Sequence, residues 1–116
     1  MPQFQELKDA ANAFRDARDW RQFHNPKDFA LSVTLEAAEL LEHFQWKNGD
    51  QVTKYLADGG KEVVKEEMAD VLIYLLMMAD DLNIDLYEAV LDKLRKQDEK
   101  YPVDKANGVS KKYTTF

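Results

Sequence analysis

The sequence contains no cysteine and only two histidines, which limits the redox and metal chemistry open to it. Without cysteine, the chain can form neither a disulfide framework nor a thiolate metal site. This composition suits a reducing compartment, and we expect the protein to be cytoplasmic.

Positive charge and long apolar runs are also scarce. Sixteen lysines and arginines stand against 22 aspartates and glutamates, a net charge of −6, so we expect no nucleic acid polymer as a partner. The longest apolar run, residues 71–79, is too short to span a bilayer, and we expect no membrane association. An acidic protein can still hold a polyphosphate when a divalent metal lies between its carboxylates and the phosphates.

With three prolines and four glycines, the 116 residues offer few breaks and suit a single domain. Apolar residues recur at three- and four-residue steps almost throughout, which is typical of helices. We therefore predict an all-α, compact four-helix domain over residues 1–116, with residues 103–116 as an extended or mobile tail. The first predicted helix ends between residues 20 and 24. The next three cover about 26–46, 61–82 and 86–101, and a short helical piece is predicted at 51–57.

Several polar residues mark the predicted helix ends. Asn25 before Pro26 is a strong start, because asparagine caps a helix and proline suits its first position. Asp85 and Glu88 resemble a capping box, and Pro102 stops the last helix. Within the third helix, residues 71–79 are apolar on nearly all sides, so we expect a second subunit to cover them. The helices would then contribute to the bundle of a homo-oligomer, a dimer or a tetramer.

Two carboxylate pairs stand at apolar boundaries of the predicted helices. Glu36 and Glu39 are three residues apart on the second helix, and Glu67 and Asp70 are three apart on the third. At this spacing both members of a pair share one helical face, and antiparallel helices would bring the pairs together. Four oxygen ligands suit a hard cation, Mg²⁺ or Mn²⁺. Spacing alone leaves a metal site and a solvated acidic face equally open, whereas a di-iron bundle would need Glu-x-x-His motifs that neither pair has.

Around these pairs the sequence resembles the MazG-like all-α nucleoside triphosphate pyrophosphohydrolases, and most of all their dCTP pyrophosphatase branch. The likeness extends over almost the whole chain. It rests on the motifs F-R-D (14–16), D-W (19–20), Q-F-H-N-P (22–26), E-A-A-E-L (36–40), F-Q-W (44–46), E-E-M-A-D-V-L-I-Y-L (66–75), Y-P (101–102) and K-K-Y (111–113). The carboxylate pairs are shared by the superfamily, and the aromatic elements are narrower.

The resemblance implies cleavage of a nucleoside triphosphate between its α- and β-phosphates, giving the monophosphate and pyrophosphate in nucleotide-pool house-cleaning. It implies that Glu36, Glu39, Glu67 and Asp70 are both the Mg²⁺ ligands and the catalytic residues. An all-α dUTPase-like or phosphoribosyl-ATP specificity stays open, as does a non-catalytic helical module that binds metal or nucleotide.

The resemblance also assigns a set of substrate-binding residues. By themselves, the aromatic members would be read as core or interface residues, the histidine as a surface residue, and the lysine as a solvated chain end. The implied set is Trp20, His24, Trp46, Tyr74, Lys112 and Tyr113. The other histidine, His43, matches no motif and is predicted to be structural.

Overall fold

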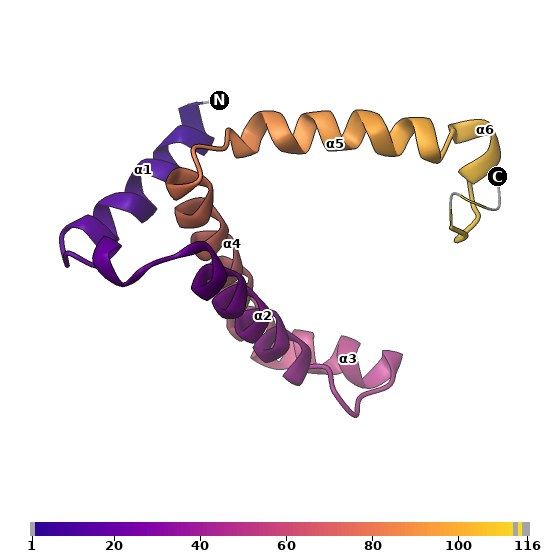
Figure 1. Cartoon of the computed structure of the whole chain (residues 1–116). Coiled ribbons are helices and arrows are strands. Elements are labelled where there is room, and N and C mark those ends of the chain that lie inside the picture. Colours follow the sequence, from indigo (N-terminus) through magenta and orange to yellow (C-terminus); the bar gives the residue numbers. More distant parts are fainter. Residues whose placement is uncertain (1, 113, 115–116) are drawn as a thin grey trace. The chain divides into compact units, whose positions relative to one another are not determined.

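The computed structural model describes residues 2–112 and 114, and the part of the chain that it describes is helical without any strand (Figure 1). The predicted all-α class is therefore confirmed. The elements in order are α1 (Pro2–Asp16), the 3₁₀ turn η1 (Arg21–Phe23), α2 (Pro26–Glu42), α3 (Gly49–Tyr55), the kinked segment η2 (Leu56–Gly60), α4 (Lys61–Asp81), α5 (Leu86–Lys100) and α6 (Val103–Ala106).

The helices form two units, Met1–Asn83 and Ile84–Phe116. In the first, α2 packs along α4, and α1 packs against α4 as well. The helices α2 and α4 run in opposite directions. His43, just after the end of α2, contacts Glu67, whereas Glu36, two turns earlier, lies near Asp70 farther along α4. This pairing places the predicted carboxylates on facing helices.

The core of the first unit is small and lies toward the end of α4. Phe29 of α2 and Leu76 and Met77 of α4 belong to it, and each of the three is at most 3% exposed. Earlier in α4, however, Leu72 and Ile73 remain 40% and 38% exposed. The apolar stretch of α4 is thus covered on one side only within a single chain.

Side-chain caps start the helices where the sequence indicated. The Asn25 Oδ1 accepts a hydrogen bond from the backbone N–H of Asp28 at 2.9 Å, and Asp85 caps α5 in the same way. A reciprocal capping box forms at α3, where Asn48 and Gln51 bond each other's backbone.

Two predicted helix ends and the tail need correction. The first helix ends at Asp16 instead of residues 20–24, because Asp19 adopts a left-handed backbone (φ +53°) and the chain turns there. The second ends at Glu42, and Trp46 (φ +69°) closes the turn after it. The predicted tail begins with the helical turn α6, so its first residues are not extended.

The corner before α4 depends on two glycines. Gly59 has a φ of +104°, a conformation that other residues rarely adopt. Gly60 is buried, and a Cβ there would lie 2.5 Å from the Tyr55 ring. The corner therefore holds Tyr55 tightly against the start of α4.

The second unit consists of α5, α6 and the residues after them. Along α5, Val90 and Leu94 lie one turn apart and are 50% and 58% exposed. Among the described helices of the whole chain, none is long and apolar enough to cross a membrane.

Candidate functional site

Three of the four predicted carboxylates converge between α2 and α4. Glu36, Glu67 and Asp70 each offer an oxygen, and these atoms all lie within 4.8 Å of one another. The spacing of Glu67 and Asp70 on α4 puts both on one face, and the antiparallel packing sets Glu36 opposite them. Oxygens grouped in this way can be brought onto one cation by small side-chain movements.

The fourth carboxylate, Glu39, lies beside Glu36. The pKa of Glu36 is raised to about 7, first by a hydrogen bond between its carboxyl group and that of Glu39, then by desolvation and by the negative charge of Glu39. The charges of Asp70 and Glu67 act in the same direction. The other three carboxylates therefore act electrostatically on Glu36, and the four belong to one cluster.

The cluster fits a hard cation by its unpaired oxygens. Oε2 of Glu36 and Oε2 of Glu67 are buried and accept no hydrogen bond from any described residue. Buried carboxylate oxygens without a partner are costly, and coordination of a cation removes that cost. The donor set is entirely oxygen, the chemistry that Mg²⁺ and Mn²⁺ prefer.

A histidine that the motifs did not indicate contacts this cluster. Nε2 of His43 lies 3.4 Å from Oε1 of Glu67, and its Nδ1 lies 2.7 Å from the Tyr55 hydroxyl. The signal in the sequence was the spacing, because His43 follows Glu36 by seven residues and so shares its helical face. The prediction that His43 is merely structural did not use this spacing.

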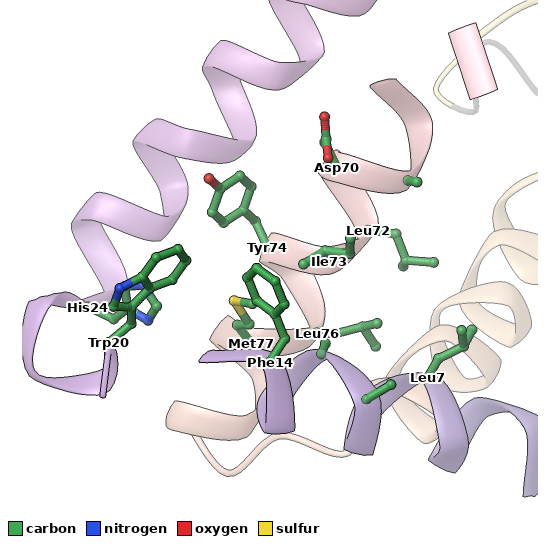
Figure 2. Close-up of a pocket in the computed structure, with 13 residues that line it drawn as sticks. Leu7, Phe14, Trp20, His24, Asp70, Leu72, Ile73, Tyr74, Leu76 and Met77 are labelled. Atoms are coloured by element: carbon green, nitrogen blue, oxygen red, sulfur yellow. The ribbon is translucent and has the colours of Figure 1, made fainter. Parts of the chain in front are cut away.

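An apolar cavity of about 550 Å³ opens next to the carboxylates (Figure 2). Its lining combines α1, the segment around η1, and one face of α4, and it consists of Leu7, Ala10, Ala11, Phe14, Trp20, His24, Ala69, Asp70, Leu72, Ile73, Tyr74, Leu76 and Met77. Asp70 belongs both to the cavity wall and to the carboxylate cluster. The charged and the aromatic parts of the predicted site therefore adjoin.

Three predicted substrate-binding residues line this cavity: Trp20, His24 and Tyr74. Trp20 packs edge-on against Phe14, with ring centroids 5.6 Å apart. Tyr74 follows Asp70 by one helical turn, which explains why both face the same space. The cavity thus has aromatic rings on two sides and a carboxylate at one margin.

Arg15 orients His24 within this wall. Its Nη1 lies 3.2 Å from Nδ1 of His24, and a guanidinium can only donate, so Nδ1 accepts and the ring proton resides on Nε2. Burial lowers the pKa of His24, and the positive charge of Arg15 lowers it further. At neutral pH, His24 is therefore an uncharged imidazole whose Nε2–H can donate a hydrogen bond.

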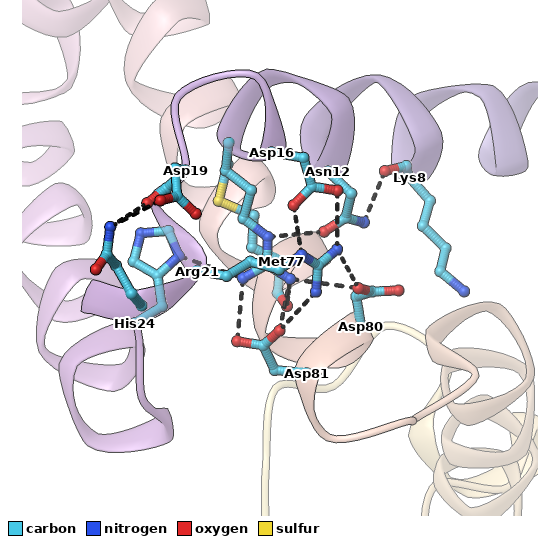
Figure 3. A network of polar contacts seen from close by, with 11 residues as sticks. Lys8, Asn12, Asp16, Asp19, Arg21, His24, Met77, Asp80 and Asp81 are labelled. Carbon is cyan, nitrogen blue, oxygen red and sulfur yellow. Dashed lines mark hydrogen bonds and ion pairs between the residues drawn. The ribbon is translucent and has the colours of Figure 1, made fainter.

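Arg15 is itself fully buried, and it donates to acidic side chains at the end of α4, where Figure 3 labels Asp80 and Asp81. It donates to Asp81 at 2.6 Å and to Asp80 at 3.3 Å, and its Nε donates to Asn12 at 3.0 Å. The hydrogen bond from Arg15 lowers the pKa of Asp81. This network ties α1 to α4, and only the F-R-D motif marked Arg15 in the sequence.

Within the first unit, Trp46 is the predicted substrate-binding residue that does not line the cavity. Trp46 is 91% exposed and is not part of its lining. Lys112 belongs to the second unit, where it borders a shallow depression with Tyr101 and Val109. Tyr113 lies outside the described residues.

Comparison with known proteins gives consistent matches along the chain. A profile described as the MazG-like family matches residues 31–116. The human protein dCTP pyrophosphatase 1 is 36% identical over 114 residues, covering 97% of this chain and 67% of the relative, and the mouse protein of that name is 34% identical over the same shares. A pyrophosphatase structure from Archaeoglobus fulgidus DSM 4304 is similar with a TM-score of 0.79 and 46% identity, covering 86% of this chain and 93% of that one.

Proposed function

Because this chain belongs to the MazG-like family, we propose that it is a Mg²⁺-dependent enzyme that converts dCTP or a related deoxynucleoside triphosphate to the monophosphate and pyrophosphate. At the coarser level it is a nucleoside triphosphate pyrophosphohydrolase. One observation carries the finer proposal: Asp70 joins a cluster of unpaired carboxylate oxygens to an aromatic cavity large enough for a nucleoside.

The carboxylate cluster would receive the triphosphate end of the substrate. Glu36, Glu67 and Asp70 would hold the cation, with Glu39 beside Glu36. Bound Mg²⁺ supplies charge neutralisation at the phosphates and lowers the pKa of an attacking water. A carboxylate oxygen that is left free of the metal, such as one on Glu39, can accept a proton from that water.

The aromatic cavity would receive the nucleoside end. Stacking of a base on an aromatic ring is worth on the order of 1–3 kcal/mol, and Trp20 and Tyr74 offer such rings. His24 presents a neutral Nε2–H, which can donate to a sugar or phosphate oxygen. The apolar lining excludes water from the base, which strengthens these few polar contacts.

We also propose that the protein works as a homo-oligomer, a dimer or a tetramer. Exposed apolar side chains on α4 and α5 support this proposal, since a soluble monomer rarely leaves so many large apolar groups uncovered.

The function is tested by incubating the protein with each deoxynucleoside triphosphate and Mg²⁺ and separating the products. We expect monophosphate and pyrophosphate, with dCTP among the best substrates. Release of orthophosphate would contradict the cleavage position, and preference for dUTP would favour a dUTPase-like specificity. Metal binding without turnover of any nucleotide would favour a non-catalytic module.

A matched pair of variants links this activity to the cluster. Asp70→Asn removes an oxygen ligand while keeping the size of the side chain, so turnover should fall by at least about 100-fold, beyond what the loss of outer-shell partners usually costs. Glu66→Gln makes the same kind of change at an exposed position of α4 and should leave turnover near wild type. Equal activity of the two variants would remove Asp70 from the site.

A further inference from the structure

His43 connects the proposed metal cluster to the corner between α3 and α4. On one side its Nδ1 lies 2.7 Å from the Tyr55 hydroxyl, and on the other its Nε2 lies 3.4 Å from Oε1 of Glu67. All three side chains are partly buried, with side-chain exposures of 20% for His43 and 18% for Glu67. A tyrosine, an imidazole and a carboxylate therefore form a continuous chain that ends on a candidate metal ligand.

Hydrogen-bond chemistry favours one direction along this chain. An ionised carboxylate can only accept, so the Nε2 that faces Glu67 must carry the ring proton. In the neutral ring Nδ1 is then an acceptor, and the Tyr55 hydroxyl donates to it. The opposite tautomer would set a ring lone pair against a carboxylate lone pair. Each donor therefore meets an acceptor from Tyr55 to Glu67.

Packing keeps Tyr55 in the position that this chain requires. Its ring stacks on His43, with centroids 5.9 Å apart and planes at 15°. Lys47 covers the ring with its Nζ 4.6 Å from the centroid, and the backbone of Gly60 allows the ring to approach closely. The hydroxyl has little freedom to turn away from Nδ1.

From this geometry we propose that His43 is a positioning residue for the metal site and that Tyr55 orients it. The contact with His43 occupies Oε1 of Glu67, so the buried, unpartnered Oε2 is the oxygen that remains for a cation. Fixing the carboxylate in this orientation keeps one oxygen ready for the metal before it binds. The inference rests on the proposed function, since it assumes that Glu67 is a metal ligand.

The test measures the binding of Mn²⁺ alone, by calorimetry and by its paramagnetic resonance, without nucleotide. His43→Leu should weaken Mn²⁺ binding by about 10- to 100-fold, the usual cost of losing an outer-shell partner. His43→Gln should recover much of this loss, because its amide N–H can take the place of Nε2–H. Glu62→Gln serves as a control, since it neutralises an exposed carboxylate of the same helix that pairs with Lys65 instead.

A second measurement does not depend on metal. The nitrogen resonances of the two histidine rings report which nitrogen carries the proton, and His24→Gln identifies the remaining ring as His43. We expect the Nε2–H form at His43 in the wild type and a weaker preference in Tyr55→Phe, which loses only the hydroxyl donor. An Nδ1–H form in the wild type would overturn the proposal even if His43→Leu did not fold.

The outcomes separate this inference from the proposed function. If the wild type binds no Mn²⁺, the metal site itself is wrong. If the wild type and His43→Leu bind Mn²⁺ equally well, the metal site stands and only the role of His43 is overturned.

Discussion

Arg15 is a buried charge on which several side chains depend. It is 0% exposed, and Asp80 and Asp81 beside it keep side-chain exposures of only 28% and 22%. Removing one partner of a buried ion pair leaves the other unpaired in a poorly solvated place, at a cost of about 3–5 kcal/mol when both are buried. We expect a loss at or below the lower end of that range for Arg15→Ala, because Arg21 still pairs with both aspartates and water still reaches them.

Urea denaturation measures this effect directly as the loss in the free energy of unfolding. Arg18→Ala is a suitable comparison, because Arg18 is exposed and lies over the Phe14 ring at 3.9 Å. Such a cation–π contact at the surface is worth about 0.5–1 kcal/mol. Similar losses in the two variants would show that the buried network adds little to stability.

Glu36 makes the stability of the metal-free protein depend on pH. Its pKa is raised to about 7 in the folded protein, against an ordinary value of 4.5. Between these pH values the folded state holds more protons than the unfolded chain, so the contribution of Glu36 to stability is lost as pH rises through that window. Glu36→Gln cannot titrate there and should lack this decline.

The comparison is made by denaturation in the presence of a chelator at several pH values across the window. The pKa of His24 is lowered, which makes stability rise with pH at the upper part of the window, but this contribution is the same in both proteins and cancels in their difference. A constant difference between wild type and Glu36→Gln would mean that Glu36 ionises normally.

The carboxylates could be predicted at the residue scale because their relation is local in sequence. Two residues three apart must share a helical face, whatever the rest of the chain does. The partners of Arg15 and Glu67 could not be predicted in this way. Arg15 meets Asp81 across 66 residues, and His43 meets Glu67 across 24, so both contacts depend on how the helices cross.

At the scale of elements, the corner between α3 and α4 is the most sensitive joint of the first unit. A Cβ on Gly60 would lie 2.6 Å from the backbone oxygen of Tyr55 as well as against its ring, and the backbone cannot move aside easily. Gly60→Ala should therefore cost about 1–3 kcal/mol, as overpacking usually does. It should also weaken Mn²⁺ binding, because Tyr55 would be displaced.

Gly49→Ala is the matched control for this prediction. A Cβ at Gly49 meets nothing within 4 Å, and the residue begins α3, where alanine is the better helix former by up to about 1 kcal/mol. We expect unchanged or slightly higher thermal stability and unchanged Mn²⁺ binding. If Gly60→Ala behaved like this control, the corner would not be tight.

Helix starts were predictable from the sequence more often than helix ends. Asn25 and Asp85 bond to the backbone three residues on, an interaction that the local sequence specifies. The ends of α1 and α2 instead depend on the left-handed residues Asp19 and Trp46, neither of which is a glycine. Aspartate adopts that conformation more often than most residues, but it does so in a small minority of cases, and tryptophan gives no signal for it at all.

For the whole molecule, the small core raises the question of what covers the remaining apolar surface. Only five hydrophobic residues are buried among those described, whereas large apolar side chains stay exposed on several helices. A 116-residue chain that buried no more than this would have little to offset its conformational entropy. The proposed homo-oligomer would cover this remaining apolar surface with further copies of the chain.

Leu94 offers a test of this assembly, because it belongs to α5 and lies far from the carboxylates in the sequence. Leu94 and Val90, one turn earlier, form an apolar strip on α5. The exposed fraction is 58% for Leu94 and 50% for Val90. Leu94→Glu places a charge in that strip and should shift the protein to smaller species, because burying an unpaired carboxylate in an interface is costly. Lys93→Glu changes the charge even more but lies outside the strip, so the assembly should persist. Sedimentation at micromolar concentration distinguishes these outcomes: a monomeric wild type would contradict the oligomer, and an unchanged Leu94→Glu assembly would exclude α5 from its interface.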